Sequence, residues 1–153
     1  MKSLANPADR AELSARLARV RADTPRQWGR MTAPQMVCHL SDVFLALMAE
    51  RPVTSPTLVV PWLRRRLLKL FALQLPLPWP HGVKTRPEVD AEQGGTPPGD
   101  FSADVAALER ACDRFIQKGP ARLEHYLFGP LTRAEWARWG YRHMDHHLRQ
   151  FGV

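Results

Sequence analysis

The sequence has few cysteines and no leader pattern at its start. Its 153 residues include only Cys38 and Cys112, which lie far apart within predicted helices. Two such cysteines do not make the disulfide framework of a small secreted protein, and they favour a reducing compartment. No basic start is followed by an apolar run, so we expect no secretory signal. These absences predict a cytoplasmic protein.

The sequence also lacks a long uninterrupted apolar run. The stretch from Leu58 to Trp79 is apolar on average, but prolines and four basic residues interrupt it. A helix that crosses a bilayer needs about 20 predominantly apolar residues. We therefore expect no membrane partner. The four basic residues are Arg64, Arg65, Arg66 and Lys69.

Acidic residues are the minority charge, 15 against 22 basic residues, which gives a formal net charge of +7. A basic balance is typical of proteins that bind nucleic acid or an anionic surface. Here the basic residues are spread along the chain, with a single run at 64–66, and aromatic residues do not alternate with them as in a platform that stacks bases. We expect a solvated surface and no nucleic-acid partner. An anion or nucleic-acid binder that uses 64–66 is the alternative.

Hydrophobic periodicity predicts helices over much of the chain, and no strand alternation is long enough to predict a sheet. Two of the helices follow capping boxes, Thr32–Gln35 and Thr132–Glu135. In one helix we expect Leu63, Leu67, Leu70 and Phe71 to point inward, with Arg65, Arg66 and Lys69 outward. The predicted helices are 8–22, 34–50, 62–75, 102–118 and 133–150.

The middle of the chain is rich in proline. Nine of the fourteen prolines fall between Pro52 and Pro98, and so long a connection is often a crossover or a functional segment. The length fits one domain. We therefore predict an all-α single domain, residues 1–153. It is a four-helix bundle with a long proline-rich crossover that carries an extra helix between the second and third bundle helices.

Two histidines of the last predicted helix, His143 and His147, are four residues apart. Side chains at this spacing lie on one helix face with Cβ atoms about 5–6 Å apart. Two imidazoles placed so can bind one metal ion at about 2.0–2.1 Å. His39, at the edge of the apolar face of helix 34–50, is the candidate third ligand. The alternative is that each histidine is a core residue satisfied by one hydrogen bond.

Three neutral imidazoles from two helices suit Zn, Ni or Fe. Three protein ligands leave positions open for water or substrate, which is the arrangement of catalytic sites. There a metal lowers the pKa of water or a thiol, or polarises a carbonyl. The protease motif H-E-x-x-H is absent, because Met144 follows His143.

The remaining histidines are weaker candidates for this site. His146 lies about 60° from His143 on the helix, toward Trp139. His81 falls in the proline-rich segment, where we expect it at the surface. His125 precedes the last helix, and we expect a structural role for it.

Other polar residues near the candidate ligands have simpler explanations. Cys38 adjoins His39 but points about 100° away on the helix, so we expect a buried, inert thiol. Asp42 and Asp145 are candidates to accept hydrogen bonds from the imidazole N–H groups. Solvent exposure or a helix ion pair is the alternative for either carboxylate.

Three stretches resemble the DinB/YfiT-like superfamily, most closely an uncharacterised subgroup with a C-terminal H-x-x-H-H-L-R-Q-F-G signature. They are 28–36 leading to His39, 128–132 leading to Glu135 and Trp136, and 143–152. The resemblance implies a four-helix bundle with a crossover between its second and third helices. It implies a metal held by His39, His143 and His147, and a homodimer. Some relatives use mycothiol, bacillithiol or glutathione, so a thiol cofactor is also implied.

The leading hypothesis is a metal-dependent enzyme with a small-molecule substrate, a hydrolase or a thiol S-transferase in type. Its three-histidine site binds a divalent metal ion and activates water or a thiol. The alternative is a non-catalytic metal-binding helical bundle, or a stress-related binding protein.

Overall fold

A computed structural model describes residues 1–54 and 60–153. Within these ranges the chain is mostly helical, with one short pair of antiparallel strands, so the predicted helical class is confirmed. The α-helices are α1 (Pro7–Leu17), α2 (Ala33–Leu47), α3 (Trp62–Gln74), α4 (Phe101–Lys118) and α5 (Arg133–Gln150). The other elements are the 3₁₀ helix η1 (Pro87–Val89) and the strands β1 (Glu124–His125) and β2 (Gly129–Pro130).

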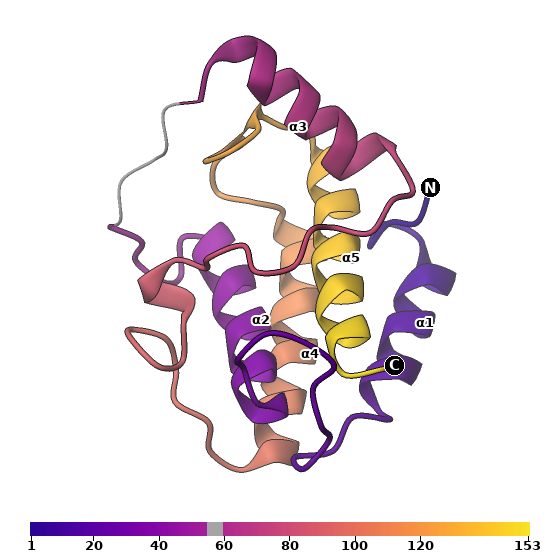
Figure 1. The fold of residues 1–153 in the computed structure, drawn as a ribbon, viewed down its shortest axis with the longest axis vertical. Coiled ribbons are helices and arrows are strands. Elements are labelled where there is room, and N and C mark those ends of the chain that lie inside the picture. Colours follow the sequence, from indigo (N-terminus) through magenta and orange to yellow (C-terminus); the bar gives the residue numbers. More distant parts are fainter. Residues whose placement is uncertain (55–59) are drawn as a thin grey trace.

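Four helices run roughly along the long axis of the molecule, and α3 lies obliquely across one end (Figure 1). Helix α2 packs on α4, while α1 and α3 both pack on α5. The connection between α2 and α4 carries α3 and then crosses in front of α5 before it reaches η1, which contacts α2 (Figure 1). This connection therefore contacts both helices that carry the candidate histidines, α5 through α3 and α2 through η1.

Local sequence signals define several helix ends. In both predicted capping boxes, the threonine side chain accepts from the backbone N–H three residues on, and the Gln35 or Glu135 side chain accepts from the threonine N–H. Helix α5 has the predicted bounds. Helix α4 begins at an Asp100 cap and ends at Gly119, whose φ of 76° favours glycine.

Helices α1 and α2 end earlier than the sequence predicts. Helix α1 stops at Leu17, yet Val20 is still buried. After Leu17 the backbone makes tighter bonds, from the N–H of Arg19 to the carbonyl of Arg16 and from Val20 to Leu17. This 3₁₀-type turn keeps the apolar periodicity while ending the α-helix. Helix α2 stops before Ala49, whose φ is 57°.

The predicted orientation of α3 is wrong for its three leucines, whereas Phe71 is partly buried and Arg66 is exposed. Leu63, Leu67 and Leu70 are 57%, 58% and 48% exposed, while Ala72 and Leu73 are buried. The helix therefore contributes its C-terminal end to the core, and its leucine stripe faces outward.

Basic side chains of α3 face the protein instead. Lys69 donates from Nζ to the carbonyl of Pro130 at 3.0 Å and forms a 2.9 Å ion pair with Glu135. Arg65 lies against Gly129, where an added Cβ would be 2.9 Å from the arginine Cδ. Contacts with residues 129–130 and with the first turn of α5 thus hold α3 in this orientation.

Helices α1, α2, α4 and α5 share one hydrophobic core. In it the rings of Phe44 on α2 and Phe115 on α4 are 5.2 Å apart. The N-terminal segment approaches α5 at Gly140, where a Cβ atom would lie 2.6 Å from Leu4 Cδ1. Because no side chain fits there, this glycine allows the close packing of Leu4 on α5.

Part of the proline-rich region lies outside the described residues. Leu58, at the start of the apolar stretch, and Pro56 belong to that part. Within 1–54 and 60–153, no helix is both long and apolar enough to cross a membrane.

Candidate metal centre

Three imidazoles from two helices meet inside the protein. His39 comes from α2, and His143 and His147 come from consecutive turns of α5. One nitrogen of each ring lies within 4.8 Å of one nitrogen of the other two. His39 and His147 are buried, and His143 is partly buried. The structure therefore brings together all three residues that the sequence selected.

Hydrogen bonds fix the ring orientation of two of these histidines. Nδ1 of His39 lies 2.7 Å from the carbonyl oxygen of Val89 in η1. A carbonyl only accepts, so Nδ1 carries the proton and the lone pair is on Nε2. Such a bond to the outer nitrogen is the usual support of a metal-binding histidine.

His147 is oriented in the same way by a side chain one turn further along α5. Its Nδ1 lies 3.0 Å from Oε1 of Gln150, whose Nε2 donates to the carbonyl of Trp28 at 2.9 Å. The bond to Trp28 fixes which end of the amide faces the histidine. His147 therefore also donates from Nδ1 and keeps its lone pair on Nε2.

The contact between His39 and His143 has the spacing of two metal ligands. Their Nε2 atoms are 3.4 Å apart. Two nitrogens at about 2.0–2.1 Å from a tetrahedral metal are separated by about 3.3–3.4 Å. Among the described residues, Nδ1 of His143 is buried with no hydrogen-bond partner. A metal bound at Nε2 leaves that nitrogen as it is, so the spacing of the Nε2 atoms is the observation that points to a metal. Three neutral imidazoles are a donor set that fits a divalent ion.

Burial sets the charge of the cluster. It lowers the pKa of His39, His143 and His147, because the protonated ring loses its hydration. The neighbouring histidines lower the pKa of His143 and His147 further. Hydrogen bonds to Val89 and Gln150 act in the opposite direction. The rings are therefore neutral near pH 7, which is the form that binds metals.

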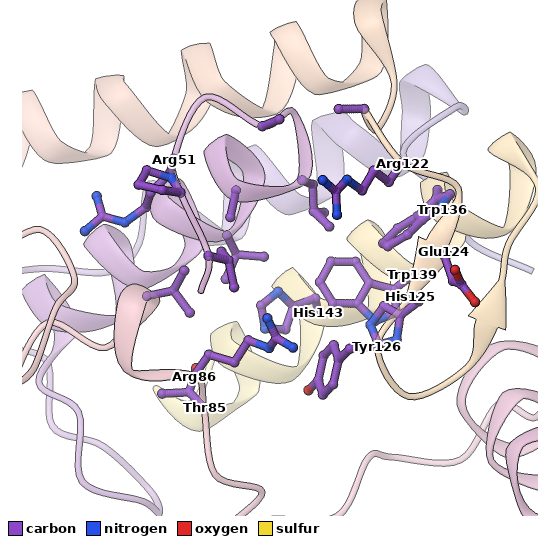
Figure 2. A pocket seen from close by; sticks show the side chains of 18 of the residues that line it. Arg51, Thr85, Arg86, Arg122, Glu124, His125, Tyr126, Trp136, Trp139 and His143 are labelled. Atoms are coloured by element: carbon purple, nitrogen blue, oxygen red, sulfur yellow. The ribbon is translucent and has the colours of Figure 1, made fainter. Parts of the chain in front are cut away.

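One side of the cluster opens to a cavity of about 540 Å³, with His39 and His143 in its wall (Figure 2). Its other walls come from the end of α2 and the start of α5, from residues 85–89 and from residues 121–126. Trp139 stacks on His143 at 4.7 Å between ring centroids and also faces the cavity. A small molecule in this space would reach two of the three histidines.

An aromatic side chain outside the cavity lining also lies near the cluster. Trp79, from the proline-rich segment that crosses α5, lies 6.2 Å from His143 and 6.0 Å from His146 between ring centroids. Arg142 on α5 donates to the carbonyls of Leu75 and Leu77 and so holds this segment down. The proline-rich crossover thus shields the histidine cluster.

The weaker histidine candidates all lie outside the three-histidine group. His81 is exposed, as predicted, but it also stacks on Trp28 with ring centroids 4.0 Å apart. His146 packs near the same tryptophan at 6.0 Å. His125 is buried, and its Nδ1 accepts from the backbone N–H groups of residues 127 and 128. It also lines the cavity, which the sequence did not predict.

Cys38 is buried, as predicted, and burial raises the pKa of its thiol to about 12. Neither predicted carboxylate partner touches the histidines. Asp42 pairs with Arg51 at 3.0 Å, and Asp145 pairs with Arg16 at 2.7 Å. The alternative of a helix ion pair is confirmed for Asp145, which also pairs with Arg149 one turn along α5. Asp42 is buried and pairs with an arginine outside its helix, so neither alternative describes it.

Two residues that support the cluster were missed. Gln150 lies three residues after His147, on the same face of α5, and this spacing was a usable signal. Val89 contributes only a backbone carbonyl, and nothing in its side chain marks it.

The geometry can be compared with known protein families. A family model described as "Protein of unknown function (DUF1569)" matches residues 12–152. The chain belongs to this family. DUF1569 is part of the DinB/YfiT-like superfamily, and the match spans all three candidate ligands. No curated protein and no solved structure matches the chain.

Proposed function

We propose that this DUF1569 protein is a metal-dependent enzyme of the hydrolase or thiol S-transferase type. His39, His143 and His147 bind one divalent ion, Zn, Ni or Fe, within a DinB/YfiT-like four-helix bundle made of α1, α2, α4 and α5. The convergence of the three imidazole nitrogens within 4.8 Å carries the proposal. His39 and His147 use Nδ1 for hydrogen bonds and so keep the lone pair of Nε2 for a ligand. Leaving buried acceptors unpaired is costly, and a shared cation would remove that cost.

Different residues bind the metal, orient its ligands and admit the substrate. A divalent metal held by three histidines supplies a Lewis acid that lowers the pKa of water or a thiol and polarises a carbonyl. Val89 and Gln150 orient two of the rings. The cavity admits a small substrate on the side of His39 and His143. Trp79 of the crossover lies beside His143, outside the cavity lining, and limits the access of solvent there.

Metal analysis of the purified protein tests the proposal. We expect one ion per chain after exposure to Zn or Ni followed by gel filtration. Occupancy should be lost in His143→Ala and in His39→Ala. His81→Ala, which removes an exposed histidine outside the cluster, is the matched control and should bind like wild type. A wild type free of metal, or full occupancy in His143→Ala, refutes the proposal.

Turnover separates an enzyme from a non-catalytic metal-binding bundle. The metal-loaded protein is assayed with thiol conjugates, esters and amides. We expect turnover that requires the metal and falls to the background rate in His143→Ala. Bound metal with a fourth protein ligand and no turnover would identify a binding protein instead.

A further inference from the structure

The cavity beside the histidine cluster carries positive charge. Among the described residues, the charged side chains that line it are three arginines and Glu124. Glu124 is exposed, and its carboxylate points away from the cavity (Figure 2). Arg51 is neutralised by Asp42 at 3.0 Å and also donates to two backbone carbonyls. The other two arginines are Arg86 and Arg122.

Arg86 is the arginine that packs on an aromatic ring of the cavity wall. Its Cζ lies 4.7 Å from the centroid of the Tyr126 ring, and Arg86, Tyr126 and His143 all line the cavity (Figure 2). A guanidinium that packs on an aromatic ring contacts the ring through its flat face. The N–H donors of the guanidinium lie in its plane and stay available to a ligand at its edge. This geometry suits a carboxylate or phosphate in the cavity.

His125 adds a neutral donor to the same wall. Its Nδ1 accepts from the N–H of Leu127 at 3.1 Å and of Phe128 at 3.4 Å, so its proton is on Nε2. In the described part of the chain no acceptor takes that Nε2–H. Burial, with a smaller contribution from Arg86, lowers the pKa of His125 to about 3. The ring therefore stays a neutral N–H donor at any working pH.

Aromatic rings form the rest of this wall. Tyr126 stacks on His125 with centroids 4.7 Å apart, and Trp139 lies 5.4 Å from the same ring. Trp136 also lines the cavity. A ligand here meets flat apolar surfaces beside a charged group and an N–H donor.

We propose that the cavity binds a small organic anion with a flat or apolar body. Its carboxylate or phosphate is held by Arg86 and the Nε2–H of His125, and its reacting group lies toward His39 and His143. The inference names the substrate class of the proposed metal site, and in that sense it rests on the proposed function. Charge-assisted hydrogen bonds to an anion are about twice as strong as neutral ones, which is the basis of the selectivity.

Calorimetric titration with matched probes tests this. The zinc-loaded wild type is titrated with phenylacetate, with the uncharged phenylacetamide of the same shape, and with phenyl phosphate. We expect at least one anion to bind tenfold or more tightly than the amide. The preferred anion distinguishes a carboxylate from a phosphate site. Equal affinities for the amide and both anions overturn the proposal.

Variants show whether Arg86 is responsible. In Arg86→Gln we expect the affinity for the preferred anion to fall at least tenfold, with the affinity for the amide unchanged. Arg66→Gln removes an exposed arginine of α3 and should behave as wild type. An unchanged preference in Arg86→Gln overturns the proposal. The comparison of probes in wild type stands even if this variant fails to fold.

Titration of the metal-free wild type separates the two proposals. If the anion preference persists without metal, Arg86 and His125 hold the anion. If it vanishes, the metal alone held the anion and this inference fails. A wild type that binds no metal but prefers the anion refutes the proposed function and leaves this inference intact. Metal binding without anion preference refutes this inference and leaves the proposed function intact.

Discussion

Gln150 joins the candidate metal centre to the N-terminal part of the chain, and its replacement by methionine tests the role of that link. The glutamine accepts from Nδ1 of His147 and donates to the carbonyl of Trp28. It is closely packed, because a Cβ atom on Gly29 would lie 2.5 Å from its Nε2. Methionine has a similar length but neither polar group.

The expected cost has two parts. Loss of the residue that orients a metal-binding histidine lowers metal affinity about 10–100-fold, which is about 1.4–2.8 kcal/mol. The metal-free protein should also lose about 1–3 kcal/mol, because the buried N–H of His147 is left without a partner. The loss of metal affinity should therefore exceed the loss that the lower stability of the metal-free protein would cause by itself.

Competition with a chromogenic chelator measures the metal affinity of Gln150→Met, and urea unfolding measures its metal-free stability. Arg149→Gln is the matched control, since it removes an exposed arginine paired with Asp145 on the same turn. We expect that control to bind metal as tightly as wild type. A Gln150→Met affinity within twofold of wild type would refute the argument that this amide orients His147.

Two further predictions concern the stability of the metal-free protein. The folded pKa of His125 is about 3, against an ordinary value of 6.5. Between these pH values the unfolded chain binds a proton at His125 that the folded chain does not. This residue should therefore lower the stability by about 1.4 kcal/mol for each unit that the pH is lowered, in addition to the other histidines whose pKa burial lowers. Urea unfolding at pH 7 and pH 5 measures the decrease, and His125→Gln should remove this part of it. In Gly140→Ala, the new Cβ meets Leu4 at 2.6 Å, so the free energy of unfolding should drop by about 1–3 kcal/mol in the same assay.

Each of these has its own control. An unchanged pH slope in His125→Gln would show that His125 titrates normally in the folded protein. For Gly140, the control is Gly99→Ala, where a Cβ atom would meet nothing closer than 3.9 Å. It should change stability by no more than about 0.5 kcal/mol. Equal stability of the two alanine variants would contradict the packing described at Leu4.

Local signals predicted the helices whose ends depend on nearby residues. The capping boxes at Thr32 and Thr132 are formed as expected, because each is complete within four residues. The end of α1 was not predictable in the same way. Periodicity reports which side chains are buried, and Val20 remains buried after the hydrogen bonds have changed from α to 3₁₀.

The orientation of α3 shows a different limit. Periodicity separates an apolar stripe from a basic one, but it does not say which stripe faces the protein. That choice depends on Glu135 and the carbonyl of Pro130, which hold Lys69 from a distant part of the chain. Long basic side chains can pack their stems against a protein surface while their charge finds a partner.

The histidine cluster was predictable because its main geometry is helical. The spacing of His143 and His147 places them on one face of α5, and His39 lies on a face that α2 must bury. The cavity was not predictable, since its walls join segments 85–89 and 121–126 across the fold. The position of His125 in the cavity wall was not predictable either. It depends on the backbone conformation of residues 125–128, whose N–H groups orient the ring.

The separation of the cluster residues along the chain bears on the order of folding. His39 and His143 are 104 positions apart, and the entropy cost of closing a loop grows with its length. Contacts this distant tend to form late, after the local helices and turns. The Val89 carbonyl adds the crossover to the same junction. We expect the junction to be complete only in fully folded molecules. The amount of bound metal would then measure the fraction of native protein, because partly folded chains would not bind it.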